Sequence, residues 1–186
     1  MSLQMTASQT VGPFLHIGMD WLNNGELAGS GERIVLEGQV RDAGGAPVPD
    51  AVIEIWQANA GGRYAHPDDP RGLPTDAGFA GFGRLPTDAE GCFRFGTVKP
   101  GRVPGPGGSL QAPHIVVLVF MRGLLKHLVT RVYFPGDPAN GEDPVLKLVP
   151  SERRATLVAQ AAAGRPGVLE WTIRLQGDEE TVFFDV

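Results

Sequence analysis

Short segments in which apolar and polar residues alternate, separated by glycine and proline, constrain the fold of this chain more than any other feature. Successive side chains of a strand point to opposite faces, so the segment RIVLEGQV (33–40) directs Ile34, Leu36, Gly38 and Val40 to one side. The 26 glycines and 16 prolines among 186 residues provide turns between such segments. The pattern predicts an all-β fold, a single β-sandwich with one or two short helices.

The other predicted elements show the same alternation or a continuous apolar run. Residues 114–123 are almost all apolar, which is typical of a strand covered on both faces. A helix is predicted over residues 151–163, with Ser151 as its N-cap and Gly164 as its stop. The remaining predicted strands are residues 51–58, 92–98, 127–134 and 169–177.

Charge and cysteine content limit the environment and the partners. The net charge of -5 gives no electrostatic reason to expect nucleic acid or an anionic membrane as a partner. Cys92 is the single cysteine, so neither an internal disulfide nor a thiolate metal site is available, and a cytoplasmic location is expected. The sequence has no run of 18 apolar residues and no signal-peptide features. We expect one domain over residues 1–186, with residues 1–30 as an N-terminal arm.

Several motifs in a fixed order resemble the intradiol ring-cleavage dioxygenase family. They are GQVRDAGGAPVPDAVIEIWQANAGGRY (38–64), the T-D-A-E-G-x-F-R-F-x-T-V-K-P-G run (87–101), A-P-H-I (112–115) and R-V-Y-F-P-G-D-P (131–138). The resemblance extends from Thr10 to Val186 and implies the sandwich of transthyretin-like topology. Within the family, SQTVGPFLHIG (8–18) and the FFD ending (183–185) are similar to the non-iron, alpha-type subunits of two-subunit enzymes.

The resemblance also identifies the positions of the family's iron ligands, two tyrosinates and two histidines. Ferric iron is a hard ion that favours anionic oxygen donors, which accounts for the two phenolates. Tyr64 and His114 stand at two of these positions, whereas Val103 and Val116 stand at the other two. Because valine has no donor atom, the resemblance implies that this chain holds no metal and that Tyr64 and His114 are remnants.

The resemblance implies a function that requires a second chain. The complete enzyme would cleave 3,4-dihydroxybenzoate with O2 to 3-carboxy-cis,cis-muconate, a step of aromatic-compound catabolism by the β-ketoadipate pathway. Fe(III) would be held by a beta-type partner subunit, and this chain alone would be inactive. The resemblance implies that this chain borders the partner's substrate pocket with Thr10, Gly12, Pro13 and Arg122.

Residues outside these motifs have simpler expected roles. The aromatic residues expected to pack on the partner or on a second copy are Phe14, Phe183 and Phe184. The histidines whose spacing fits no standard metal site are His16, His66 and His127. The charged residues expected to be structural are Asp68, Asp69 and Arg131.

Two other functions remain open at this point. A stand-alone intradiol dioxygenase would need four iron ligands, which Val103 and Val116 do not supply. A non-enzymatic, transthyretin-like binding module would fit the first motif but not the later ones. For single residues, Tyr64 and His114 could be plain core residues, the Gly12–Pro13 pair an ordinary turn, and Arg122 a solvated charge.

Overall fold

Ten strands of the computed structural model, which describes residues 5–69, 71–72, 74 and 76–185, form two four-stranded sheets and a small two-stranded one. The first sheet has the order β4-β1-β10-β9, formed by Cys92–Val98, Arg33–Arg41, Val168–Arg174 and Gln160–Ala161. The second has the order β3-β2-β7-β8, formed by Phe82–Pro86, Val52–Trp56, His114–Phe120 and Leu128–Tyr133. The small sheet pairs β5 (Val103–Pro104) with β6 (Leu110–Gln111).

Helical structure is short wherever it occurs in the described part of the chain. The α-helix α1 spans only Phe14–Ile17. The 3-10 turns are η1 (Asp20–Leu22), η2 (Pro106–Gly108), η3 (Pro138–Gly141), η4 (Leu146–Leu148) and η5 (Ser151–Leu157). The structure therefore confirms the prediction of an all-β sandwich.

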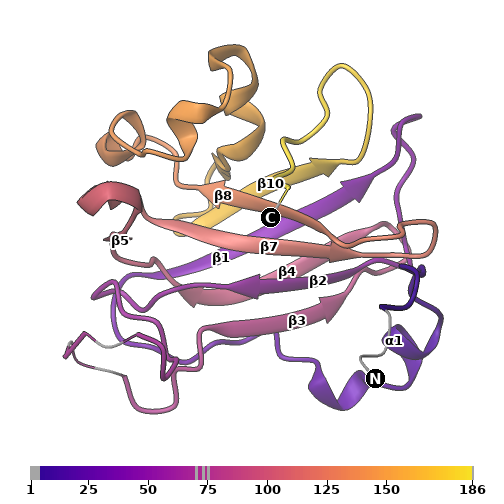
Figure 1. Ribbon diagram of the computed structural model, residues 1–186, viewed down its shortest axis with the longest axis horizontal. Helices are drawn as coiled ribbons and strands as arrows, with labels where there is room; N and C mark the ends of the chain where they lie inside the picture. The colour runs from indigo at the N-terminus through magenta and orange to yellow at the C-terminus, as the bar shows by residue number, and fades with distance from the viewer. Residues whose placement is uncertain (1–4, 70, 73, 75, 186) are drawn as a thin grey trace.

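The two large sheets lie face to face, and their inward side chains form the core (Figure 1). On β1, Ile34, Leu36 and Val40 are buried, as the alternation predicts. Gly38 is the fourth member of this row, and a Cβ atom there would lie 2.0 Å from the ring of Phe93 on β4. The row thus uses a glycine so that a neighbouring aromatic ring can cover the strand.

The prediction that the strand at 114–123 is covered on both faces was wrong. On β7, Ile115, Val117 and Val119 are buried in the core, whereas Val116 and Leu118 on the opposite face are only half-buried. The strand also ends at Phe120. The outer face of β7 is therefore apolar but incompletely covered, and two of the family's ligand positions, His114 and Val116, lie on this face.

The predicted helix at 151–163 was also wrong in its second half. The chain forms a 3-10 turn over Ser151–Leu157 with Pro150 as its N-cap, and then enters β9. Ala159 N–H donates to Tyr133 O (3.0 Å), and β9 pairs with β10, so sheet pairing outweighs local helix propensity. Gly164, expected to stop the helix, has φ +70° in the turn between these two strands.

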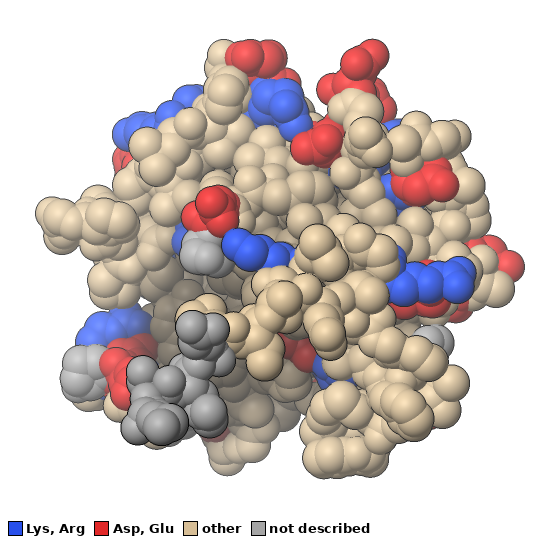
Figure 2. All heavy atoms as spheres, turned by 45° about the vertical axis from the view of Figure 1, so that its right-hand side comes forward, with Lys and Arg blue, Asp and Glu red and all other residues tan. Residues whose placement is uncertain are grey.

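The sandwich has two ends of different character. The N-terminal arm with α1 and the turn between β7 and β8 lie at one end, and β5 with the start of β7 lies at the other (Figure 1). On the face shown in Figure 2, acidic and basic side chains occur in small groups between broad uncharged areas. Among the described residues, no helix is long and apolar enough to cross a membrane.

Candidate functional site

The N-terminal arm is fastened to the β7–β8 turn through Thr10. The Thr10 hydroxyl oxygen accepts the Gly123 N–H at 2.8 Å, and the hydroxyl donates to Met121 O at 3.4 Å. More than 110 residues separate these partners along the chain. The contact brings the predicted residues of the arm next to Arg122.

Arg122, Gly12 and Pro13 line one cavity of about 230 Å³. Its other walls are Val11, Leu15, Ile17, Asp50 and Val52. The Arg122 side chain is 80% exposed, and its Nε lies 2.5 Å from an oxygen of Asp50. An exposed ion pair is worth at most about 1 kcal/mol, so Arg122 can exchange this partner at little cost. We call Thr10, Gly12, Pro13, Asp50 and Arg122 the arm site.

A buried arginine that the sequence did not reveal holds the arm on the sheet. Arg84 on β3 is 3% exposed and forms an ion pair with Glu54 on β2. Its Nη2 donates to the carbonyl of Leu15 at 2.7 Å, two residues after Pro13. Its backbone also pairs with Asn24 further along the arm. Arg84 was missed because β3 was not predicted from its glycine- and proline-rich sequence.

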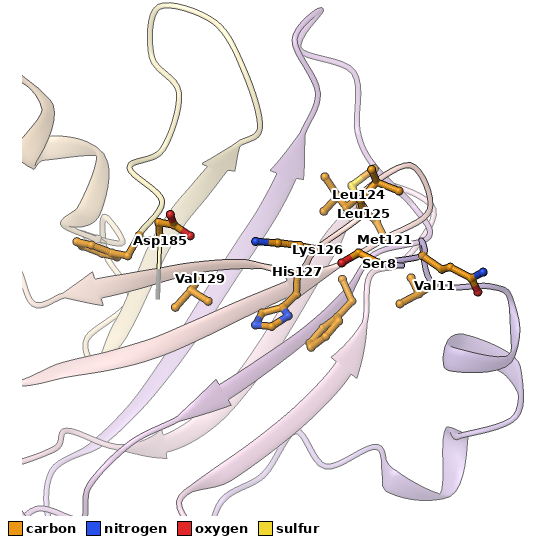
Figure 3. A pocket seen from close by; sticks show the side chains of 12 residues that line it. Ser8, Val11, Met121, Leu124, Leu125, Lys126, His127, Val129 and Asp185 are labelled. Atoms are coloured by element: carbon orange, nitrogen blue, oxygen red, sulfur yellow. The ribbon is translucent and has the colours of Figure 1, made fainter. Parts of the chain in front are cut away.

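A second hollow adjoins the arm site and shares one wall residue, Val11, with it. It has a volume of about 340 Å³. Figure 3 shows that Ser8 comes from the arm, Lys126 and His127 from the β7–β8 turn and Asp185 from the C-terminal segment. Residues of the arm, the β7–β8 turn and the C-terminal segment thus line one hollow, which reaches from the arm towards the middle of β8.

The positions of the family's metal ligands lie at the opposite end of β7. His114 opens this strand, and Arg122 follows eight positions later, just beyond the end of the strand at Phe120; at about 3.3 Å per residue the strand alone is roughly 20 Å long. Val103 lies buried in β5, and Val116 pairs on β7 with Trp56 of β2. We call Tyr64, Val103, His114 and Val116 the remnant position.

The two surviving ligand residues are engaged by this chain's own groups. The Tyr64 ring is stacked on Trp56, with the ring centroids 5.8 Å apart. The His114 side chain is buried, and its Nδ1 donates to Ala112 O at 2.8 Å. Burial and the nearby charge of Arg131 lower the pKa of His114 to about 4, so the ring is neutral at pH 7. Burial raises the pKa of Tyr64, which disfavours the phenolate.

This environment does not fit a ferric ion. Two of the four positions carry aliphatic side chains, which provide no donor atom, and two donors alone do not make the family's ligand set. Among the described residues, no group of three or more His, Cys, Asp or Glu side chains could hold a metal ion.

Other predicted residues have local roles or lie elsewhere. Asp69 accepts hydrogen bonds from Tyr64 N (2.9 Å) and from Arg71, and the latter holds the pKa of Asp69 well below its usual range. His66 lies edge-on to Trp56, and His127 stacks on Phe120 at the end of β7 that lies near the arm. The side chain of His16 lies outside the described part of the chain.

The aromatic residues predicted to pack on a partner are not equivalent. Phe183 and Phe184 are partly buried against this chain's own two core clusters. Phe14 in α1 is 82% exposed. Packing against another chain therefore stays a prediction, and Phe14 is the residue best placed for it.

Comparison with known proteins places these features in one family. A model of the family described as Dioxygenase matches residues 17–177. The chain is 45% identical over 203 aligned residues to the protocatechuate 3,4-dioxygenase alpha chain of Burkholderia cepacia, covering 100% of this chain and 99% of that relative. It is 42% identical over 156 residues to the protocatechuate 3,4-dioxygenase beta chain of the same species, covering 82% of this chain and 66% of that one.

A solved structure agrees with these sequence matches. The dioxygenase domain of a dioxygenase carbohydrate-binding protein fusion from Streptomyces sp. SirexAA-E superimposes with a TM-score of 0.62 and 26% identity. The superposition covers 86% of this chain and 89% of that chain. The matches extend well beyond the first motif, which was the only part of the sequence that a transthyretin-like binding module would have explained.

Proposed function

This chain belongs to the intradiol ring-cleaving dioxygenase family, and from that premise we propose that it is the non-iron alpha-type subunit of a protocatechuate 3,4-dioxygenase. Its partner is a beta-type subunit of the same family. Together they cleave 3,4-dihydroxybenzoate with O2 to 3-carboxy-cis,cis-muconate, so that both oxygen atoms of O2 enter the ring-opened product. The observation that carries the proposal is the separation of an exposed arm site from a remnant position that does not fit iron.

The catalytic iron of the pair belongs, in this proposal, to the partner. The family uses non-haem iron, which when bound would act as the Lewis acid that activates the catechol ring towards O2. The valines at positions 103 and 116, which provide no donor atom, support this assignment. This chain acts through binding and positioning alone.

Arg122 is the group through which this chain reads the substrate. In 3,4-dihydroxybenzoate the carboxylate lies across the ring from the 4-hydroxyl group, so a group remote from the partner's iron would meet it. A guanidinium is protonated at neutral pH and can meet a carboxylate with two parallel hydrogen bonds. Asp50 engages Arg122 through Nε, and the two terminal nitrogens of the guanidinium are the atoms that an incoming carboxylate can meet.

Thr10, Gly12 and Pro13 shape the approach to Arg122. Thr10 ties the arm to the turn that carries Arg122, and Gly12 and Pro13 form the wall beside it. Since the arm site lies at the surface, its residues can close the partner's pocket from outside. In this proposal, the face of the chain around the arm is therefore the surface that contacts the beta-type subunit.

Metal analysis of the separated and assembled chains tests the proposal. The purified chain alone should hold far less than one iron per chain and should lack the visible tyrosinate-to-iron band. Co-expressed with a beta-type chain, it should co-purify as a complex that consumes O2 with 3,4-dihydroxybenzoate. Stoichiometric iron with a charge-transfer band in the isolated chain would instead identify a stand-alone dioxygenase and overturn the proposal.

A further inference from the structure

The remnant position has a charged neighbour that the family's ligand pattern does not include. Arg131 on β8 lies directly opposite Val116 on β7 in the strand register. Directly paired side chains lie on the same face of a sheet, with their Cβ atoms about 5 Å apart. Arg131 therefore stands next to one of the two positions where a ligand is replaced by valine.

Arg131 also contacts the residue paired with the other valine. Its Nη1 donates to Gln111 Oε1 at 2.6 Å, and Gln111 pairs with Val103 across β5 and β6. On another side, the guanidinium lies over the ring of Phe184, 5.8 Å from the centroid. The side chain is thus fixed between the small sheet and the C-terminal segment, beside both valine positions.

Arg131 thus brings a permanent positive charge to the remnant position. The strand register and the bond to Gln111 place its side chain beside both valines, and a guanidinium does not lose its proton in proteins. Because like charges repel, a metal cation entering between these residues would be opposed by this charge.

We propose that Arg131 is a built-in cation that excludes metal from the remnant position, fixed between Gln111 and Phe184 beside both valines. The inference rests on the proposed function, in which the iron of the pair belongs to the partner. It adds that two features disfavour metal binding at the remnant position. One is the absence of two ligands, and the other is a fixed positive charge that repels a metal cation.

Restoring the ligands in the presence and absence of this charge tests the inference. The background variant is Val103→Tyr with Val116→His, prepared as the full chain co-expressed with its beta-type partner. Into it are introduced Arg131→Gln, which keeps a polar side chain beside Gln111, and Arg131→Lys, which keeps the charge. Arg165→Gln, an exposed arginine paired with Glu37 and Glu170 on the other sheet, is the control.

Iron content per pair of chains and the visible spectrum are the readouts. We expect the background, Lys and control variants to match the wild-type complex in iron content. The Gln variant should hold at least about threefold more iron at the restored site than the background variant, with added charge-transfer absorption. Cobalt(II) titration, followed by its visible absorption, provides a second measure that does not depend on iron loading in the cell.

Two results would overturn the inference. The first is a background variant that fills its restored site with Arg131 in place. The second is a Gln variant that binds neither iron nor cobalt better than the Lys variant. If the wild-type chain alone held stoichiometric iron, the proposed function itself would fail. That result is independent of how the variants compare with one another in metal binding, so the two failures can be told apart.

Discussion

The two ends of β7 use the same kinds of residue in opposite ways. At the arm end, Arg122 is exposed and has one surface partner, Asp50. At the remnant end, the buried His114 is bonded to Ala112 O and the partly buried Arg131 to Gln111 Oε1. Polar groups that can exchange partners are suited to act on another molecule, whereas engaged buried groups hold the fold. The comparison predicts that substitutions at the remnant end affect stability and those at the arm end affect the reaction.

The largest expected effect is on stability, at Asp143 near the remnant end. This fully buried carboxylate accepts hydrogen bonds from Ala112 N (2.7 Å), Leu146 N (2.7 Å) and Tyr133 Oη (3.2 Å). Asp143→Ala leaves these donors without an acceptor, at a cost of roughly 3–5 kcal/mol.

Thermal unfolding of the assembled enzyme measures this effect. Asp143→Ala should lower the midpoint by many degrees, whereas the control Asp178→Ala, in an exposed loop, should leave it nearly unchanged. If both variants unfold at the wild-type temperature, the remnant end does not hold the fold in the way proposed.

The second prediction concerns the pH dependence of stability at the remnant end. The folded pKa of His114 is lowered to about 4, below the 6.5 of an exposed histidine. Stability due to the neutral ring is therefore complete above pH 6.5. It is lost as the pH falls from 6.5 to 4, because the unfolded chain binds a proton that the folded chain does not. The loss should reach at most roughly 3 kcal/mol.

The difference in stability between wild type and His114→Gln, measured from pH 7.5 to pH 4, isolates this contribution. Glutamine keeps a donor for Ala112 O but does not titrate. We expect the advantage of the wild-type chain to shrink with acidification. A difference that stays constant over this range would show that His114 titrates normally.

The third prediction is at the arm end, where activity should respond instead. A charge-assisted hydrogen bond contributes roughly 1.5–3 kcal/mol, so Arg122→Ala should lower kcat/KM for 3,4-dihydroxybenzoate about tenfold or more. Catechol, which has no carboxylate, should lose much less. Oxygen uptake by the assembled enzyme with both substrates measures the difference, with Arg165→Ala as the matched control. Equal losses for the two substrates would mean that Arg122 supports the structure and does not read the carboxylate.

Secondary structure could be predicted from the sequence where it depends on neighbouring residues, but not where it depends on pairing with distant strands. Alternation along β1 and β4 follows from residues that are neighbours in the chain, so the sandwich was predictable. The helix expected at 151–163 failed because Ala159 and Gln160 pair with distant strands, which local propensity does not register. Strand β3 was missed because its five residues depend on pairing with β2.

The residues of the candidate site could be predicted where they belong to a motif of the family. The resemblance pointed to Thr10, Gly12, Pro13 and Arg122, and the structure brings them together. Arg131 was expected to be structural, and the role proposed for it depends on the register of the β7–β8 hairpin, which places it opposite Val116. Charges that act across strands are visible in a sequence only after the pairing is known.

The smallest expected effect separates two roles of Asp50 at the arm end. A carboxylate beside Arg122 would compete with a substrate carboxylate if it merely occupied the guanidinium. Asp50 meets Nε, however, and is only 30% exposed, so it is placed to fix the direction of the fork while the terminal nitrogens stay accessible. Asp50→Asn keeps an oxygen that can accept from Nε but loses the charge. We therefore expect a loss in kcat/KM for 3,4-dihydroxybenzoate of about threefold, corresponding to less than 1 kcal/mol, and no change for catechol. In the Arg122→Ala background the same substitution should have no further effect, because a positioning residue has nothing left to position. An increase in kcat/KM for Asp50→Asn would show that Asp50 competes with the substrate, and an equal loss in both backgrounds would show that it acts independently of Arg122.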